Sequence, residues 1–379
     1  MESQELQAWL RLTLTPGVGN ETARKLLAAF GSAQAVFAQS AVSLRQLGTD
    51  KLVGALQTEP ANLAGQLQTT MDWLQAGDDR RVVPLGDAAY PPALLDIEDP
   101  PLVLYMLGAQ VNRAQTAAKT IATKLAIVGS RNPTPQGEAN ARQFAKAFGS
   151  AGLCVVSGLA LGVDGAAHDG AMLGGGETIA VVGTGLDRVY PKKHLALAHR
   201  IARQGMIISE FPLGTPPLTA NFPKRNRIIS WLSVGTLVVE AALQSGSLIT
   251  ARLAAEQGKE VFAIPGSIHS PQSRGCHALI KQGAKLVELA QDVLEELNFP
   301  LTVSTGSACT ASDRADSASE QPADDPLLSA LGFDAVSLDA LQARTGLETA
   351  RLQAQLLEFE LNGQVARLPG GLFQRLAAG

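Results

Sequence analysis

Short apolar runs alternate with stretches of helical spacing across the middle of the chain. The apolar runs lie at residues 125–128, 154–156, 178–182, 206–208, 236–239, 261–264 and 285–287, and helical patterns lie between them, as at 139–148, 166–173, 195–203 and 249–257. Apolar strands between helices are typical of a parallel sheet covered on both faces. The pattern predicts an α/β fold, a Rossmann-like doubly wound, mostly parallel sheet, in a domain spanning residues 80–298.

The flanking segments follow other patterns. Apolar residues at helical spacing predict small helices in residues 1–75, where the Thr-Pro-Gly-Val-Gly turn at 15–19 resembles the hairpin of helix-hairpin-helix modules. Backbone N–H groups at such a turn can meet a phosphate, but the acidic charge of this segment favours a simple tight turn between packed helices. Small polar and acidic residues at 299–325 predict a linker. Residues 326–379 show three helices and two strands, the pattern of a winged helix.

The net charge of −4 over 379 residues argues against a generic nucleic-acid binder, but the charge is unevenly distributed. The balance of Lys and Arg over Asp and Glu is −3 for residues 1–79, +4 for 80–298 and −5 for 299–379. An anionic partner is therefore expected on the middle domain. The last helix of the winged helix, at 348–360, carries three acids and one arginine, so we expect it to contact protein rather than DNA.

Cysteine usage and hydropathy exclude several classes of protein. Cys154, Cys276 and Cys309 are scattered without a CxxC spacing, so neither a metal site nor a disulfide framework is predicted, and we interpret them as buried small apolar residues. The first residues lack the basic start of a signal peptide, and no apolar run approaches the roughly 20 residues of a membrane span. A cytoplasmic protein without a membrane partner is expected.

A basic stretch precedes the apolar run at 236–239 and is the most informative part of the chain. It combines two amides, an aromatic ring and three cations, namely Asn221, Phe222, Lys224, Arg225, Asn226 and Arg227. Cations supply phosphate contacts, and an exposed aromatic ring supplies a face on which a base stacks. The alternative is an ordinary helix start with a solvated basic face.

The loops that follow the other predicted strands favour the first interpretation. Ligands of open α/β sheets bind at the carboxyl ends of the strands. No loop there has the GxGxxG or GxxxxGK[ST] pattern, so neither a dinucleotide nor any other cofactor is predicted. Small residues stand instead beside cations, as in Gly129-Ser130-Arg131 and in the segment from Ser245 to Arg252. Glycine lets a phosphate approach the backbone, so the array suits a phosphodiester chain.

Three groups near these strand ends allow a catalytic interpretation. Asp164 and His168, four residues apart, could form an acid–base pair, although a capping aspartate and a packed histidine are favoured. Glu240 could be catalytic or could hold an arginine, and the second is favoured. Ser245-Gly246-Ser247 lacks the GxSxG elbow of a nucleophile, so helix capping is favoured for it.

Taken together, these loops resemble one family. The segments in question are 127–131, 157–164 with Ala167 and His168, 222–229, 238–241 with 245–250, and Pro265-Gly266. In this order they closely resemble the DNA-processing protein A family (DprA, also called Smf) over residues 80–290. The resemblance implies an N-terminal SAM-like domain and a C-terminal winged helix. It also implies a non-enzymatic homodimer that binds and protects single-stranded DNA without sequence preference and loads the RecA recombinase onto it during natural transformation.

The resemblance also implies roles for individual residues. It puts Ser130 and Arg131 on phosphates, Phe222 against a base, and Lys224, Arg225 and Asn226 on the DNA backbone. With the strand-end argument, the predicted DNA-binding set is Gly129, Ser130, Arg131, Ser157, Gly158, Asn221, Phe222, Lys224, Arg225, Asn226, Arg227, Ser247, Thr250 and Arg252. Trp231 and Gln136 depart from the family pattern, which leaves the shape of the groove rim open.

A hydrolase is the alternative function. Gly235-Thr236 shortly before Glu240 resembles a Rossmann-like group of nucleoside monophosphate phosphoribohydrolases, whose pattern is Pro-Gly-Gly-x-Gly-Thr-x-x-Glu. This chain lacks the Pro-Gly-Gly lead, and three residues rather than two separate Thr236 from Glu240. The sequence therefore favours a DNA-binding mediator over an enzyme.

Overall fold

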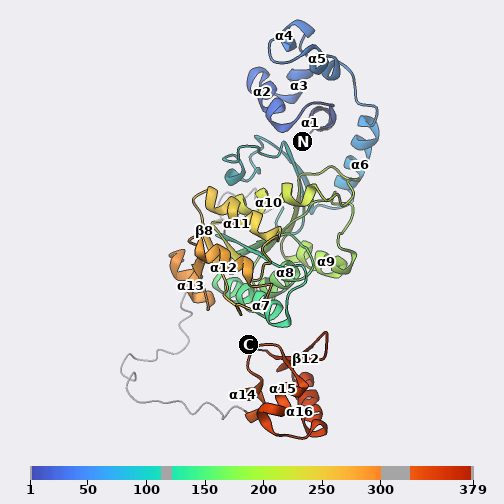
Figure 1. The fold of residues 1–379 in the computed structure, drawn as a ribbon. Coiled ribbons are helices and arrows are strands. Elements are labelled where there is room, and N and C mark those ends of the chain that lie inside the picture. Colours follow the sequence, from blue (N-terminus) through green and yellow to red (C-terminus); the bar gives the residue numbers. More distant parts are fainter. Residues whose placement is uncertain (1, 112–121, 300–324, 377–379) are drawn as a thin grey trace, which may run out of the picture.

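The computed structural model describes residues 2–111, 122–299 and 325–376. Within these residues, one large sheet has the strand order β1-β2-β6-β5-β4-β3-β7-β8-β9. Figure 1 shows helices packed around this sheet. Its strands are β1 (Arg80–Pro84), β2 (Val103–Leu107), β3 (Lys124–Val128), β4 (Cys154–Ser157), β5 (Thr178–Val181), β6 (Met206–Ser209), β7 (Gly235–Val238), β8 (Glu260–Ala263) and β9 (Lys285–Leu286). Only β1 and β2 run antiparallel to their neighbours. The predicted Rossmann-like, mostly parallel sheet is confirmed.

Helices cover both faces of the sheet. One face carries α10 (Asn221–Leu232), α11 (Ser247–Glu256) and α12 (Arg274–Lys281), and the other carries α7 (Pro135–Ala151), α8 (Val163–Leu173), α9 (Leu195–Gln204) and α13 (Ala290–Glu296). Side chains alternate between the faces of a strand. Ala126 and Val128 of β3 therefore pack under α10, while Leu125 and Ile127 pack under α7 and α8. The near-continuous apolar strands of the sequence follow from this double burial.

The N-terminal helices are packed onto the antiparallel edge of the sheet. They are α1 (Ser3–Leu14), α2 (Asn20–Phe30), α3 (Ala33–Phe37), α4 (Ala41–Arg45), α5 (Asp50–Gln57) and α6 (Leu63–Gln75). Their apolar core continues into β1 and β2, and the ring of Trp73 meets that of Tyr105 edge-on with centroids 6.1 Å apart. The turn between α1 and α2 places Gly17 at φ +81°, a conformation that glycine adopts readily. The short helix η1 (Pro92–Leu94) lies between β1 and β2.

The C-terminal unit has a core of its own. It contains α14 (Pro326–Leu331), β10 (Val336–Ser337), α15 (Leu338–Thr345), α16 (Thr349–Leu361), β11 (Val365–Leu368) and β12 (Leu372–Arg375). The strands pair in the order β10-β12-β11, and Leu341, Leu352 and Leu356 are buried between the helices and this small sheet. The predicted winged-helix pattern is therefore present. Nearly all of the predicted linker at 299–325 lies outside the described residues, and the domain limits stay predictions.

None of the described helices is both long and apolar enough to span a membrane.

Candidate nucleic-acid interface

A cleft of about 660 Å³ lies at the carboxyl ends of β3 and β7. These two strands are neighbours, but the chain continues from β3 toward β4 on one side and from β7 toward β8 on the other. Ligands of open α/β sheets bind at such a switch point. Eight predicted residues line the cleft: Gly129, Ser130, Arg131, Phe222, Arg225, Asn226, Ser247 and Thr250. The other six do not line it: Ser157, Gly158, Asn221, Lys224, Arg227 and Arg252.

The loop after β3 forms one wall and is held from three sides. Val163 donates its N–H to the Ser130 carbonyl (3.1 Å), and the Gln272 amide donates to the Asn132 carbonyl (3.2 Å). Glu240 holds the far end of the loop through Thr134. The backbone N–H groups of Ser130 and Arg131 donate to no group in the described part of the chain. They remain available to an anion in the cleft.

The partner of Glu240 is Thr134, not an arginine as the sequence suggested. Its carboxylate accepts the Thr134 N–H at 2.9 Å and the Thr134 hydroxyl at 2.6 Å. Burial raises the pKa of the Glu240 carboxyl, and the hydrogen bonds from Thr134 oppose this. Thr134 is also the N-cap of α7, because its hydroxyl accepts the Gly137 N–H at 3.0 Å. The carboxylate thus anchors the start of α7 and the cleft wall before it.

This anchor gives a stability prediction. Thr134→Ala removes the cap and one donor to a half-buried carboxylate, so we expect the free energy of unfolding to fall by about 1–2 kcal/mol. Thr134→Ser keeps the hydroxyl and is the matched control, expected to lose much less. Urea denaturation of both variants measures the difference. Equal losses for alanine and serine would show that the hydroxyl does not hold the loop.

The cleft brings a free cation and two aromatic rings together. The Arg131 guanidinium lies 5.3 Å from the Phe222 ring centroid, and Phe222 contacts Tyr190 with ring centroids 5.7 Å apart and planes tilted by 38°. Arg131 is exposed and has no carboxylate within 4 Å in the part of the chain that the structure describes. Tyr190 is 47% exposed. The arrangement offers a positive charge for a phosphate and a ring surface for a base.

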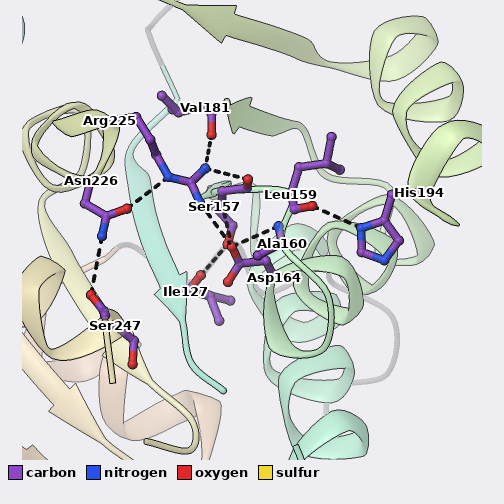
Figure 2. Close-up of polar contacts among 12 residues, drawn as sticks. Ile127, Ser157, Leu159, Ala160, Asp164, Val181, His194, Arg225, Asn226 and Ser247 are labelled. Atoms are coloured by element: carbon purple, nitrogen blue, oxygen red, sulfur yellow. Dashed lines mark hydrogen bonds and ion pairs between the residues drawn. The ribbon is translucent and has the colours of Figure 1, made fainter. Parts of the chain in front are cut away.

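Arg225 does not point into solvent, which corrects its expected place on the DNA backbone. The basic stretch is the first half of α10, and Arg225 is only 4% exposed there. Its guanidinium donates to the carbonyls of Gly158 and Val181 and lies 4.0 Å from Asp164 (Figure 2). Burial lowers the pKa of Arg225 to about 10, with Asp164 acting in the opposite direction. The Nε and one Nη of Arg225 thus donate to protein groups, and the side chain is held in the protein at the edge of the cleft.

Arg227 is also withdrawn from the cleft. It pairs with Glu210, whose side chain is 9% exposed, and lies 4.0 Å from Asp99, on the side of α10 that faces the segment between β1 and β2. Lys224 and Arg252 are exposed, but neither lines the cleft. Of the five predicted cations, Arg131 is the one that combines exposure with a place in the cleft wall.

The remaining predicted residues shape the cleft from beneath. The Ser157 hydroxyl donates to the Ile127 carbonyl at 2.6 Å, and the Asn221 amide donates to the Gly183 carbonyl at 3.1 Å. Ser247 and Thr250 lie on the first turn of α11 at the cleft floor. The Ser245 hydroxyl accepts the Ser247 N–H at 3.3 Å, but the expected capping role is wrong, because Gly246 is the N-cap of α11 and no side chain caps this helix.

His168 is packed as favoured, but Asp164 is not a helix cap, because Gly162 is the N-cap of α8 and no side chain caps this helix. Asp164 accepts the N–H groups of Gly158 and Ala160, at 3.1 and 3.2 Å, so it shapes the loop before α8. His168 is fully buried, and its Nδ1 lies 2.7 Å from the Thr178 hydroxyl. Burial, followed by the charges of His194 and Arg225, lowers the pKa of His168 to about 3. It therefore stays neutral at physiological pH, as a packed histidine does.

Sequence reasoning missed Tyr190 and the basic turn that follows it. The short helix η3 (Lys192–His194) comes directly after Tyr190 and Pro191, with Lys192 and Lys193 exposed. The signal was present in the sequence as an aromatic residue followed within three positions by two lysines. It was overlooked because these residues lie in a connection rather than directly after a strand.

No group of metal-binding side chains occurs among residues 2–111, 122–299 and 325–376. Cys154 and Cys276 are buried and unpaired, as expected of small apolar residues, and Cys309 lies outside the described residues.

Comparison with known proteins identifies the family. The family model of the DNA recombination-mediator protein A matches residues 81–298. The chain belongs to this family. The DprA-like N-terminal HHH domain matches residues 3–44 and the DprA winged helix domain matches residues 311–371. The resemblance seen in the strand-end loops is confirmed, and so is the winged helix. The N-terminal helical module, expected as SAM-like, matches an HHH domain, the class that the acidic charge disfavoured for the turn at 15–19.

Individual relatives agree with this assignment. Protein Smf of Escherichia coli is 42% identical over 309 residues, covering 80% of each chain. DNA processing protein DprA of Streptococcus pneumoniae is 45% identical over 213 residues, covering 56% of this chain and 73% of the relative. The X-ray structure of DprA from Streptococcus pneumoniae superposes with a TM-score of 0.60 at 34% identity, over 78% of this chain and 98% of the other.

A second solved relative is a protein whose binding of single-stranded DNA has been described. DNA processing protein A from Helicobacter pylori, whose structure describes a unique single-stranded DNA binding mode, matches with a TM-score of 0.51. It is 30% identical and covers 58% of this chain and 95% of that one.

Proposed function

We propose that this protein binds single-stranded DNA in the cleft at the ends of β3 and β7 and acts as a recombination mediator rather than an enzyme. The observation that carries the proposal is Arg131, an exposed cation without a carboxylate partner in the described residues, beside unused backbone N–H groups and two contacting aromatic rings. Phosphates bind cations and free amides, whereas unpaired bases stack on aromatic rings. Family membership and the DNA-binding relative from Helicobacter pylori support the same ligand.

The contacts follow from where each side chain lies. Ser130 and Arg131 meet phosphates from the β3 loop, while Phe222 and Tyr190 meet bases. Asn226, Ser247 and Thr250 line the cleft floor beneath the strand, and the exposed Lys224, Lys192, Lys193 and Arg252 add charge outside the cleft. Arg225 and Arg227 are not part of this contact set, because Arg225 is buried against the carbonyls of Gly158 and Val181 and Arg227 is paired with Glu210 outside the cleft.

The wider role comes from the family. We infer that the chain is a cytoplasmic homodimer that protects incoming single strands and delivers them to the RecA recombinase during natural transformation. Sedimentation velocity tests the dimer. Joint molecule formation by RecA on strands already coated with a single-strand-binding protein tests the delivery, which requires faster joining when this protein is added.

A salt titration tests the DNA site itself. We expect tighter binding to a single-stranded than to a double-stranded oligonucleotide, because only unpaired bases can reach the rings. Arg131→Ala removes one phosphate contact, so binding weakens across sequences and the slope of log K against log salt becomes shallower by about 0.7. Lys281→Ala removes an exposed cation outside the cleft and is the control. If Arg131→Ala and Lys281→Ala give the same slope, the site is elsewhere.

A further inference from the structure

Arg225 is the most deeply buried cation beside the cleft, and its hydrogen bonds end on a loop, on the last residue of a strand and on the neighbouring Asn226. It donates to the carbonyl of Gly158 in the β4–α8 loop and to that of Val181 at the end of β5. Its Nε donates to the Asn226 side chain at 2.9 Å, and the Asn226 amide donates to the Gly246 carbonyl at 3.3 Å before α11 (Figure 2). Arg225 thus links α10 to the carboxyl ends of β4 and β5, and Asn226 extends the link to the segment after β7.

The residues around the Arg225 guanidinium leave space for it and balance its charge. A Cβ on Gly158 would overlap the Arg225 Nη atoms, so position 158 has no room for any side chain while Arg225 holds its place. Asp164 supplies the opposite charge and itself accepts two N–H groups of the same loop. A buried arginine is tolerated where all its donors have acceptors and its charge is matched.

The first turn of α10 carries the aromatic ring of the cleft. Phe222 stands three residues before Arg225, and in a helix such residues lie on neighbouring turns of one side. Asn221 adds a second tie, through the Gly183 carbonyl. The position of the Phe222 ring against Tyr190 therefore depends on how firmly this turn is held to the sheet.

We propose that Arg225 is a positioning residue that fixes the first turn of α10, and with it the stacking face of Phe222, without touching the DNA. This rests on the proposed single-stranded DNA site and specifies how that site is held. Arg131 binds a phosphate from a different loop, which Glu240, Val163 and Gln272 hold in place. The loss of Arg225 therefore acts on base stacking and leaves the phosphate contact intact.

The test is binding of a single-stranded oligonucleotide over a range of salt concentrations. Arg225→Lys keeps the charge, but a single ammonium cannot reach the acceptors on Gly158, Val181 and Asn226 at once. We expect binding to weaken about tenfold, the effect of losing about 1.4 kcal/mol, with an unchanged salt slope. A direct phosphate contact predicts the opposite for Arg225→Met, a shallower slope by about 0.7, and that result overturns the proposal.

A double-mutant cycle identifies the route of the effect. In a protein that already carries Phe222→Ala, Arg225→Lys is expected to weaken DNA binding little further, since both substitutions remove the same stacking contact. Combined with Arg131→Ala, the two losses are expected to add. Additive losses with Phe222→Ala overturn the proposal.

A second variant covers the case in which Arg225→Lys does not fold. Gly158→Ala leaves every charge in place and displaces the guanidinium, so weaker binding with the wild-type salt slope is expected once a thermal melt has shown it folded. Wild-type affinity in a folded Gly158→Ala overturns the proposal. Failure of the wild-type protein to bind single strands overturns the proposed function itself, whereas normal binding by the Arg225 and Gly158 variants overturns only the positioning role.

Discussion

Replacing Arg227 with methionine is expected to lower the free energy of unfolding by about 3–5 kcal/mol, the usual effect of leaving a buried charge without its partner. The side chains of Arg227 and Glu210 are 14% and 9% exposed and form an ion pair. The partly exposed Asp99, 4.0 Å from Arg227, cannot take the place of the arginine for Glu210, because it carries the same charge. Urea denaturation measures the loss. Arg252→Met, on an exposed cation, is the control and should change stability by less than about 0.5 kcal/mol.

The loss of stability in Arg227→Met should depend on pH in a direction that follows from the pKa of Glu210. Burial raises the pKa of the Glu210 carboxyl, and the Arg227 charge opposes the rise. Without Arg227 the pKa of the folded state rises further above its unfolded value, so the folded variant binds a proton that the unfolded chain does not. Its stability should therefore increase as pH falls through the folded pKa, and the deficit should shrink. Arg227→Met combined with Glu210→Met should recover most of the loss, and a double variant as unstable as the single one would contradict the assignment.

The fold was predictable because its signal is local. Each strand of the parallel sheet is buried on both faces, so each appears as a short apolar run, and the amphipathic stretches between them became α7, α8, α9 and α11. The winged helix was predictable for the same reason. The loops that follow the strands could be placed at one edge without knowing any distance, since all parallel strands end there.

The basic stretch shows where this reasoning stops. Successive residues of a helix point about 100° apart, so Arg225 points away from Lys224, whereas Lys224 and Arg227 lie on the same side and still differ in exposure. The sequence shows that charges are present but not which of them are neutralised. The partners of Arg225 are Asp164 and the Gly158 carbonyl, more than 60 positions away, and that of Arg227 is Glu210 across a different loop. Only the assembled sheet shows that both face the interior.

Glu240 and Tyr190 are two further residues whose partners could not be predicted from the sequence. A carboxylate at a strand end near several arginines suggested an ion pair, yet the nearest donors are the N–H and hydroxyl of Thr134, which arrives from the neighbouring strand β3. Tyr190 stands in a connection without any motif, and only its contact with Phe222 gives it a role. Both outcomes depend on which loops the strand order brings together.

The aromatic pair leads to the second large effect. Phe222→Ala and Tyr190→Ala are each expected to weaken binding of single-stranded DNA by about 1–3 kcal/mol, the range for one base stacked on one ring. Neither substitution removes a charge, so the salt slope should stay at its wild-type value, in contrast to Arg131→Ala. The two kinds of contact can therefore be separated in one series of titrations.

Matched controls make this prediction specific to stacking. Tyr190→Phe keeps the ring and should bind nearly as well as wild type, whereas Phe222→Leu keeps apolar bulk without a ring and should lose most of what Phe222→Ala loses. Because the rings touch with centroids 5.7 Å apart, they form one surface, and the double alanine variant should lose less than the sum of the single losses. A Phe222→Leu variant with full affinity would mean that the residue packs against the protein rather than against a base. Strictly additive single losses would instead mean that each ring stacks a separate base.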